Sequence, residues 1–105
     1  MIKLTVLYGH PKDPAAFEKY YLGTHDPLLR KVSGMRRVEL SKAIGTADGK
    51  QAPYYRMAEL YFDDVPHMQS VLATPEARAT VADIPNFATG GVTIYVSDVH
   101  AVVGS

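Results

Sequence analysis

One stretch decides how the chain is organised: residues 9–29, GHPKDPAAFEKYYLGTHDPLL. Asp13 followed by Pro14 is typical of a helix start, because the aspartate oxygen accepts free N–H groups of the first turn and proline has no N–H to leave unpaired. At about 100° per residue, one arc of this helix collects Phe17, Tyr21, Thr24, His25, Leu28 and Val32. We therefore expect a helix over roughly 14–32 that turns His25 toward the interior.

The same helix carries a weak point beside His25. Gly23 lowers helix propensity, and Pro27 in the pair Asp26-Pro27 cannot donate a helical hydrogen bond. We expect the helix to break or restart there, which frees backbone groups next to the imidazole.

The remaining segments complete a simple alternating pattern. Residues 2–8, 35–43, 53–62 and 92–96 have the apolar alternation of strands, and the turn formers of 45–53 join the second strand to the third as a hairpin. A second helix, capped by Asp63-Asp64 and restarted at Thr74-Pro75, precedes the fourth strand. The order βαββαβ with right-handed crossovers predicts an α+β fold, the ferredoxin-like plait, with a four-stranded antiparallel sheet and both helices on one face.

Length and composition exclude several classes of protein. The 105 residues make a single domain, 1–105, and the 11 basic and 11 acidic side chains cancel without a basic cluster, so we expect no nucleic-acid or membrane partner. There is no cysteine, and the four histidines lack the spacing of a metal site, so we expect no metal and no cofactor. The N-terminus lacks a signal-peptide pattern, which favours a cytoplasmic location.

The uncovered face of the sheet bears on assembly. Strands one, three and four carry large apolar or aromatic residues in both registers, so we expect the face away from the helices to be too apolar for water. A symmetric homodimer would cover it.

Several residues carry a family resemblance: Phe17-Glu18-Lys19-Tyr20-Tyr21, then His25-x-Pro27-Leu28, then Gly34-Met35. In βαββαβ order they resemble the EthD-type family, named for ethyl tert-butyl ether degradation, within the dimeric α/β-barrel superfamily. The resemblance covers essentially the whole chain, although Ser33 stands where the family often has proline. It implies a homodimer whose sheets form a barrel, with a pocket in each subunit between sheet and helices.

His25 is the strongest candidate catalytic residue, because imidazole exchanges a proton near neutral pH. The alternative is a structural histidine that bonds to the backbone at the helix break. Tyr21, one turn earlier, is the second candidate, although such tyrosines are more often core residues. The candidate substrate-binding residues are aromatic, which is equally typical of a core: Tyr8, Phe17, Tyr61, Phe62 and Phe87.

Three functions remain open. The first is a pocket protein of EthD type, accessory to breakdown of an apolar or aromatic small molecule, with an oxygenase system as a further partner in that pathway. The second is a cofactor-independent isomerase, cyclase or decarboxylase that uses His25 as general base. The third is a non-enzymatic structural dimer module with a filled core. Fold alone does not choose among them.

Overall fold

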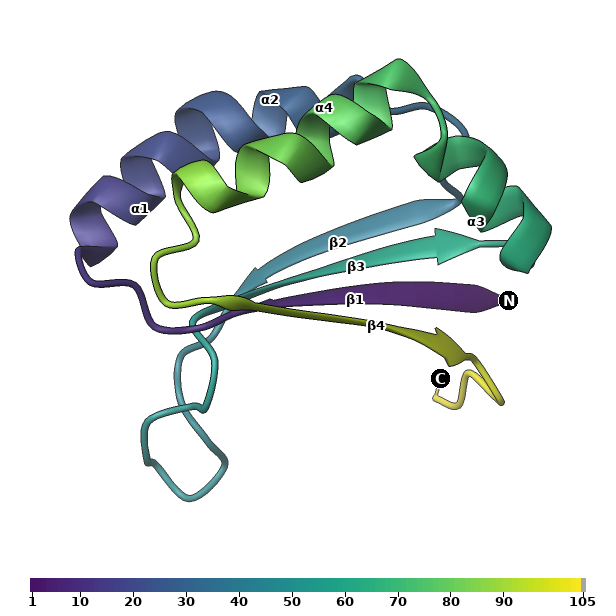
Figure 1. Cartoon of the computed structure of the whole chain (residues 1–105). Coiled ribbons are helices and arrows are strands. Elements are labelled where there is room, and N and C mark those ends of the chain that lie inside the picture. Colours follow the sequence, from purple (N-terminus) through teal and green to yellow (C-terminus); the bar gives the residue numbers. More distant parts are fainter. Residues whose placement is uncertain (105) are drawn as a thin grey trace.

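The computed structural model describes residues 1–104 and contains one four-stranded antiparallel sheet with helices on one face (Figure 1). The strands are β1 (Ile2–Tyr8), β2 (Arg37–Lys42), β3 (Arg56–Phe62) and β4 (Val92–Asp98), in the order β2-β3-β1-β4. The helices are α1 (Pro14–Tyr20), α2 (Asp26–Arg30), α3 (Val65–Leu72) and α4 (Pro75–Asp83), with a π-helical turn at Tyr21–His25 and a short 3-10 helix at Ile84–Asn86. The predicted ferredoxin-like α+β fold is confirmed.

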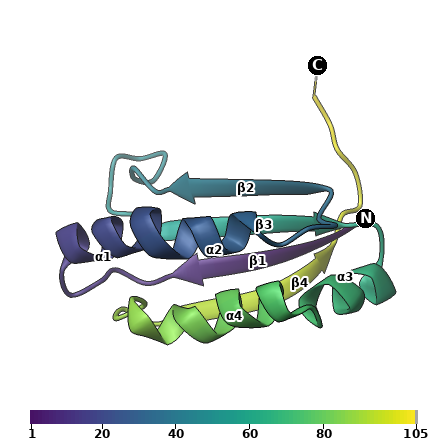
Figure 2. The ribbon, with the colours of Figure 1, turned by 90° about the horizontal axis from the view of Figure 1, so that it is seen from above.

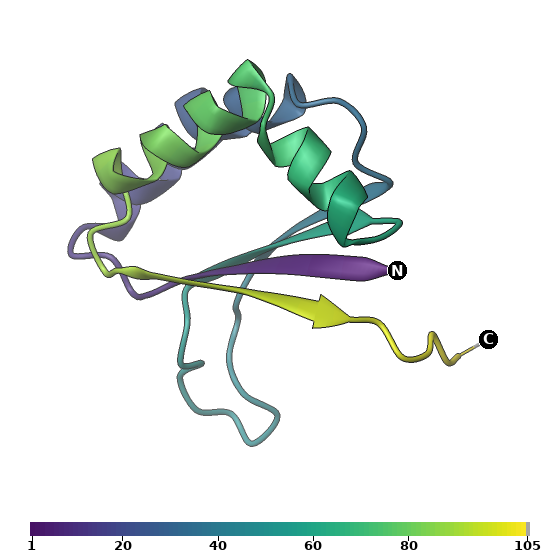
Figure 3. The same cartoon turned by 45° about the vertical axis from the view of Figure 1, so that its right-hand side comes forward.

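Three short caps set where the helices begin. The side chains of Asp13, Asp64 and Thr74 accept hydrogen bonds from backbone N–H groups three residues later, at 3.1, 2.8 and 3.3 Å. Each helix then has proline in its first turn, where no N–H is needed. The Thr74 cap also lets the chain change direction between α3 and α4 (Figure 3).

The core lies between the sheet and the helices. Strand register aligns Val6 of β1 with Ala58 of β3 and Ile94 of β4, and these side chains point toward the helices. Viewed from above, α1 and α2 lie over the middle of the sheet and α4 lies on the β4 side (Figure 2). Three large side chains are almost fully buried in this layer: Tyr8, Tyr21 and Phe62.

The long helical segment after Asp13 passes through a π turn instead of breaking. The N–H of Asp26 bonds to the carbonyl of Tyr21, five residues earlier, and Pro27 follows without an N–H of its own. The wider turn keeps every fourth residue on the buried side, namely Phe17, Tyr21, His25 and Leu29. The predicted arc is therefore wrong at two positions, because Thr24 is exposed and Leu29, not Leu28, is the buried leucine.

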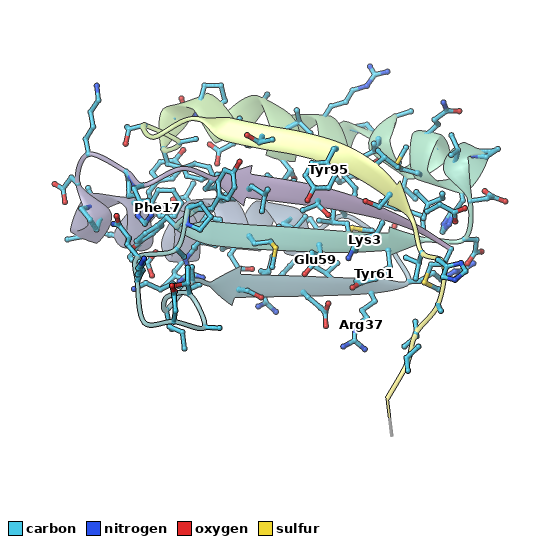
Figure 4. The ribbon with its side chains drawn as sticks, turned by 90° about the horizontal axis from the view of Figure 1, so that it is seen from below. Lys3, Phe17, Arg37, Glu59, Tyr61 and Tyr95 are labelled. Atoms are coloured by element: carbon cyan, nitrogen blue, oxygen red, sulfur yellow. The ribbon has the colours of Figure 1, made fainter. Side chains whose placement is uncertain are left out.

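The uncovered face of the sheet is less apolar than we expected from the sequence. Figure 4 shows charged and aromatic side chains together on this face. Lys3 pairs with Glu59 at 2.8 Å, and Glu39 accepts hydrogen bonds from Arg37 at 2.6 Å and Tyr61 at 2.9 Å. The expected apolar face is therefore mixed, with its charges paired. The exposed apolar row instead lies on the helix-facing side of edge strand β4: Val92, Ile94 and Val96.

A close backbone approach joins the end of β1 to the start of β4. The N–H of Gly9 donates to the carbonyl of Gly91 at 3.0 Å, and a Cβ added at Gly9 would lie only 2.1 Å from the carbonyl oxygen of Gly90. Only glycine tolerates this approach. It fixes the loop that carries Phe87 against the loop that leads into α1.

Within residues 1–104, no helix combines the length and apolar character needed to cross a bilayer.

Candidate functional site

A cavity of about 270 Å³ lies between the sheet and the helices. Its wall is almost entirely apolar and includes no lysine, arginine or carboxylate. Val81 of α4 and Ile94 of β4 are half exposed, which places the mouth between these two elements. The lining comes from both helical segments and from three strands: Leu4, Val6, Tyr8, Tyr21, His25, Leu29, Val32, Ala58, Leu60, Leu72, Ala77, Thr80, Val81, Ile84 and Ile94.

His25 brings the imidazole to this cavity from the last position of the π turn. It is only 3% exposed, and its Nδ1 lies 3.0 Å from Oδ2 of Asp83. The structure therefore gives Nδ1 a side-chain partner, where a structural histidine at the helix break was expected to bond to the backbone. Its partner is a buried carboxylate, 58 residues away in sequence.

Asp83 reaches His25 from the C-terminal end of α4. It continues the buried stripe of this helix after Ala77 and Thr80, at a spacing of three residues. The Tyr20 hydroxyl donates to Oδ1 at 2.5 Å, and the Asn86 amide donates to the same oxygen at 3.0 Å. Burial raises the pKa of Asp83, but the hydrogen bonds from Tyr20, Asn86 and His25 outweigh it and hold the pKa below its usual value.

The carboxylate determines which nitrogen of a neutral His25 ring carries the proton. An ionised Asp83 can only accept, so Nδ1–H donates to it and Nε2 is left with its lone pair. Among residues 1–104, every fully buried polar side-chain atom has a hydrogen-bond partner. Nε2 makes no hydrogen bond to the protein, so it is not fully buried, and His25 lines the cavity. Nε2 therefore opens onto the cavity as a hydrogen-bond acceptor.

Tyr8 and Tyr21 also line the cavity, and each carries a hydroxyl group. Burial raises the pKa of the Tyr8 hydroxyl well above its usual value and that of Tyr21 to about 12, so both remain protonated and can donate hydrogen bonds. The Arg56 guanidinium lies 4.9 Å from the centre of the Tyr21 ring. It is already held by Glu18, at 2.6 and 2.9 Å.

The structure brings together three of the seven residues proposed for the site from the sequence, His25, Tyr21 and Tyr8. Phe87 packs against His25, with ring centres 4.5 Å apart, and Phe17 stacks on Tyr21 at 5.4 Å, so both support the site from behind. The other two residues lie elsewhere. Tyr61 is on the opposite face of the sheet, bonded to Glu39, and Phe62 packs against His67 near the start of α3.

Asp83 and Asn86 were not predicted from the sequence. The available signal was a carboxylate on the buried stripe of α4, where a solvated acid is not expected. Within the described residues, no group of three or more histidine and acidic side chains is arranged to hold a metal ion.

Known proteins match this chain along most of its length. The EthD domain model matches residues 10–91. An uncharacterized 11.0 kDa protein from the thcB–thcC intergenic region of Rhodococcus erythropolis is 36% identical over 103 residues, covering 98% of this chain and 99% of the relative.

Solved structures agree with that match. An EthD family protein from Bacillus halodurans is 35% identical with a TM-score of 0.85, over 93% of this chain and 97% of the other. A dimeric ferredoxin-like protein of unknown function from Bacteroides fragilis shares the fold at 14% identity, with a TM-score of 0.66 over 92% and 94% of the two chains. The family model and the two closely matching relatives place this chain in one family: it belongs to the EthD domain family.

Proposed function

We propose that this protein binds an apolar or aromatic small molecule in the cavity between its sheet and helices. The role is accessory to breakdown of such a compound, of the ether-degradation type, alongside an oxygenase system. The observation that carries the proposal is the apolar wall around about 270 Å³. An apolar cavity of about 150 Å³ already binds benzene in another protein, so this volume accommodates a substituted ring. A structural module with a filled core does not account for such a space.

NMR titration with toluene tests the binding proposal. We expect saturable shifts of the methyl signals of Leu29 and Leu60, which line the cavity. Ala77→Leu fills the cavity from α4 and should weaken binding at least about tenfold, which corresponds to about 1.4 kcal/mol. Ala79→Leu is the matched control, because Ala79 is exposed on the same helix. Absence of any saturable shift in the wild-type protein contradicts the proposal.

A second candidate function is general-base catalysis without a cofactor, as an isomerase, cyclase or decarboxylase. The pair of His25 and Asp83 favours it, because a carboxylate behind Nδ1 orients the ring and stabilises the imidazolium that forms. The α-carbon of a carbonyl compound would give its proton to Nε2, the C–H electron pair would form the C=C bond of an enolate, and the π pair of the C=O bond would move to the oxygen. The Tyr8 and Tyr21 hydroxyls can donate to that oxygen.

Deuterium exchange into the methyl group of acetophenone in D₂O tests this chemistry directly. We expect exchange above the buffer rate in the wild-type protein and loss of the excess in His25→Ala, while acetophenone still binds. Exchange that is equal in both proteins removes the general-base role and leaves the binding role intact.

We also propose a homodimer, as in the Bacteroides fragilis relative, which is dimeric. The exposed apolar row of β4, Val92, Ile94 and Val96, supports this assembly because such rows are usually covered. Sedimentation that finds a folded monomer at micromolar concentration contradicts it.

A further inference from the structure

We infer that the cavity selects uncharged ring compounds that carry one hydrogen-bond donor, such as a phenol, and that Asp83 sets this preference by fixing the His25 tautomer. This inference rests on the proposed binding function and specifies its ligand.

The charge of the surroundings excludes an anion. No lysine or arginine lines the cavity. The Arg56 guanidinium lies beneath Tyr21 and its charge acts on the Tyr21 hydroxyl, but it is engaged by both carboxylate oxygens of Glu18. The charge of Asp83 lies directly behind His25 and also acts on the Tyr8 hydroxyl. An anionic ligand would therefore lose its hydration, gain no cation and face a buried negative charge.

A cation is excluded for a related reason. The oxygens of Asp83 are occupied by Tyr20, Asn86 and His25, and the imidazole stands between the carboxylate and the cavity. The rest of the wall is aliphatic or aromatic and offers no carboxylate. A charged amine would thus be buried without a partner.

The hydrogen-bond pattern then determines which neutral ligand fits. In the tautomer that Asp83 imposes, Nε2 accepts, whereas the Tyr8 and Tyr21 hydroxyls can donate. A phenolic hydroxyl satisfies both sides, because its proton goes to Nε2 and its oxygen accepts from a tyrosine. A ligand that only accepts leaves Nε2 unpaired in a dry site, and this costs affinity.

Three probes of matched size test the inference by NMR titration at neutral pH. They are p-cresol, p-methylanisole, which can only accept, and p-toluate, which is an anion. We expect p-cresol to bind wild-type protein about tenfold more tightly than either of the others, because a site that hydrogen-bonds a hydroxyl discriminates against analogues lacking it. The nitrogen-15 shifts of the His25 ring should show the Nδ1–H tautomer.

The second part of the test repeats these titrations with the Asp83→Asn variant. An amide at this position can donate to Nδ1, which moves the ring proton to Nε2 and turns the acceptor into a donor. The preference for p-cresol over p-methylanisole should then fall to about one or reverse, with the Nε2–H tautomer visible in the nitrogen-15 spectrum. Asp98→Asn is the control, because Asp98 is an exposed carboxylate at the end of β4.

The outcomes separate the inference from the proposed function. If no probe binds, both are overturned. If all three bind wild-type protein equally, the binding function stands and the selection is refuted. If wild-type protein prefers p-cresol and Asp83→Asn keeps the same preference with the proton on Nε2, the role assigned to Asp83 is refuted. The wild-type series and its nitrogen-15 spectrum decide the ligand class even if the variant does not fold.

Discussion

Replacing Asp83 by alanine should reveal how much the buried pair contributes to stability. The change removes the acceptor of three hydrogen bonds, from His25, Tyr20 and Asn86. The His25 Nδ1–H is buried, with its residue 3% exposed, so leaving it unpaired costs about 1–3 kcal/mol. Tyr20 is half-buried and Asn86 exposed, so their groups can turn to water and add less.

The loss is partly offset, because the variant no longer buries a carboxylate. We therefore expect the free energy of unfolding at pH 7 to fall by about 2–4 kcal/mol. The assay is urea denaturation followed by circular dichroism, at one fixed protein concentration because association would contribute to stability. Asp98→Ala, which removes an exposed carboxylate, should change stability by less than about 0.5 kcal/mol.

The pH dependence gives an independent check. The pKa of Asp83 is lower in the folded protein than its ordinary value, so its stabilisation is present above the unfolded pKa of about 3.9 and is lost as pH falls below it. The difference between wild type and Asp83→Ala should therefore shrink as the pH falls below about 4. A difference under about 0.5 kcal/mol at pH 7, or one that grows as the pH falls below about 4, refutes the reasoning.

Four further substitutions test other parts of the structure by the same denaturation assay. Tyr20→Phe removes one donor to the carboxylate and should cost about 1 kcal/mol; no loss would mean that water replaces it. Gly9→Ala should lower the free energy of unfolding by more than about 2 kcal/mol, because the new Cβ meets the Gly90 carbonyl. Gly23→Ala has free space around its Cβ and should raise the free energy of unfolding by about 0.5–1 kcal/mol. Equal effects of the two substitutions would contradict this. Leu60→Ala should cost about 2–5 kcal/mol and enlarge the cavity enough to tighten binding of a larger ring such as naphthalene.

Most of the fold could be predicted because its signals are local. The caps at Asp13, Asp64 and Thr74 and the alternation of the strands are each readable within a few residues, and handedness then leaves few topologies. The polarity of the uncovered face was harder to predict from the sequence. Its ion pairs, such as Lys3 with Glu59, depend on register between strands distant in sequence.

The site was predictable only in its helical half. Periodicity places His25 and Tyr21 on the buried side, and the structure has them there. Asp83 could not be found in the same way, because its role depends on α2 and α4 lying side by side, and an acid near a helix end is usually solvated. Leu28 was chosen over Leu29 because the prediction assumed regular α-helical spacing, which the π turn interrupts.

The π turn also lets the helix tolerate a change in chain length beside the imidazole. It accommodates one residue more than a regular α-helix would need between Tyr21 and Asp26. Deleting Gly23 would let the segment relax to a regular α-helix in which every later residue keeps its side relative to α1, because the deletion removes the one residue that the π turn absorbs. A single codon can therefore be lost at this point of the gene while the imidazole and the buried side of α2 still face the cavity.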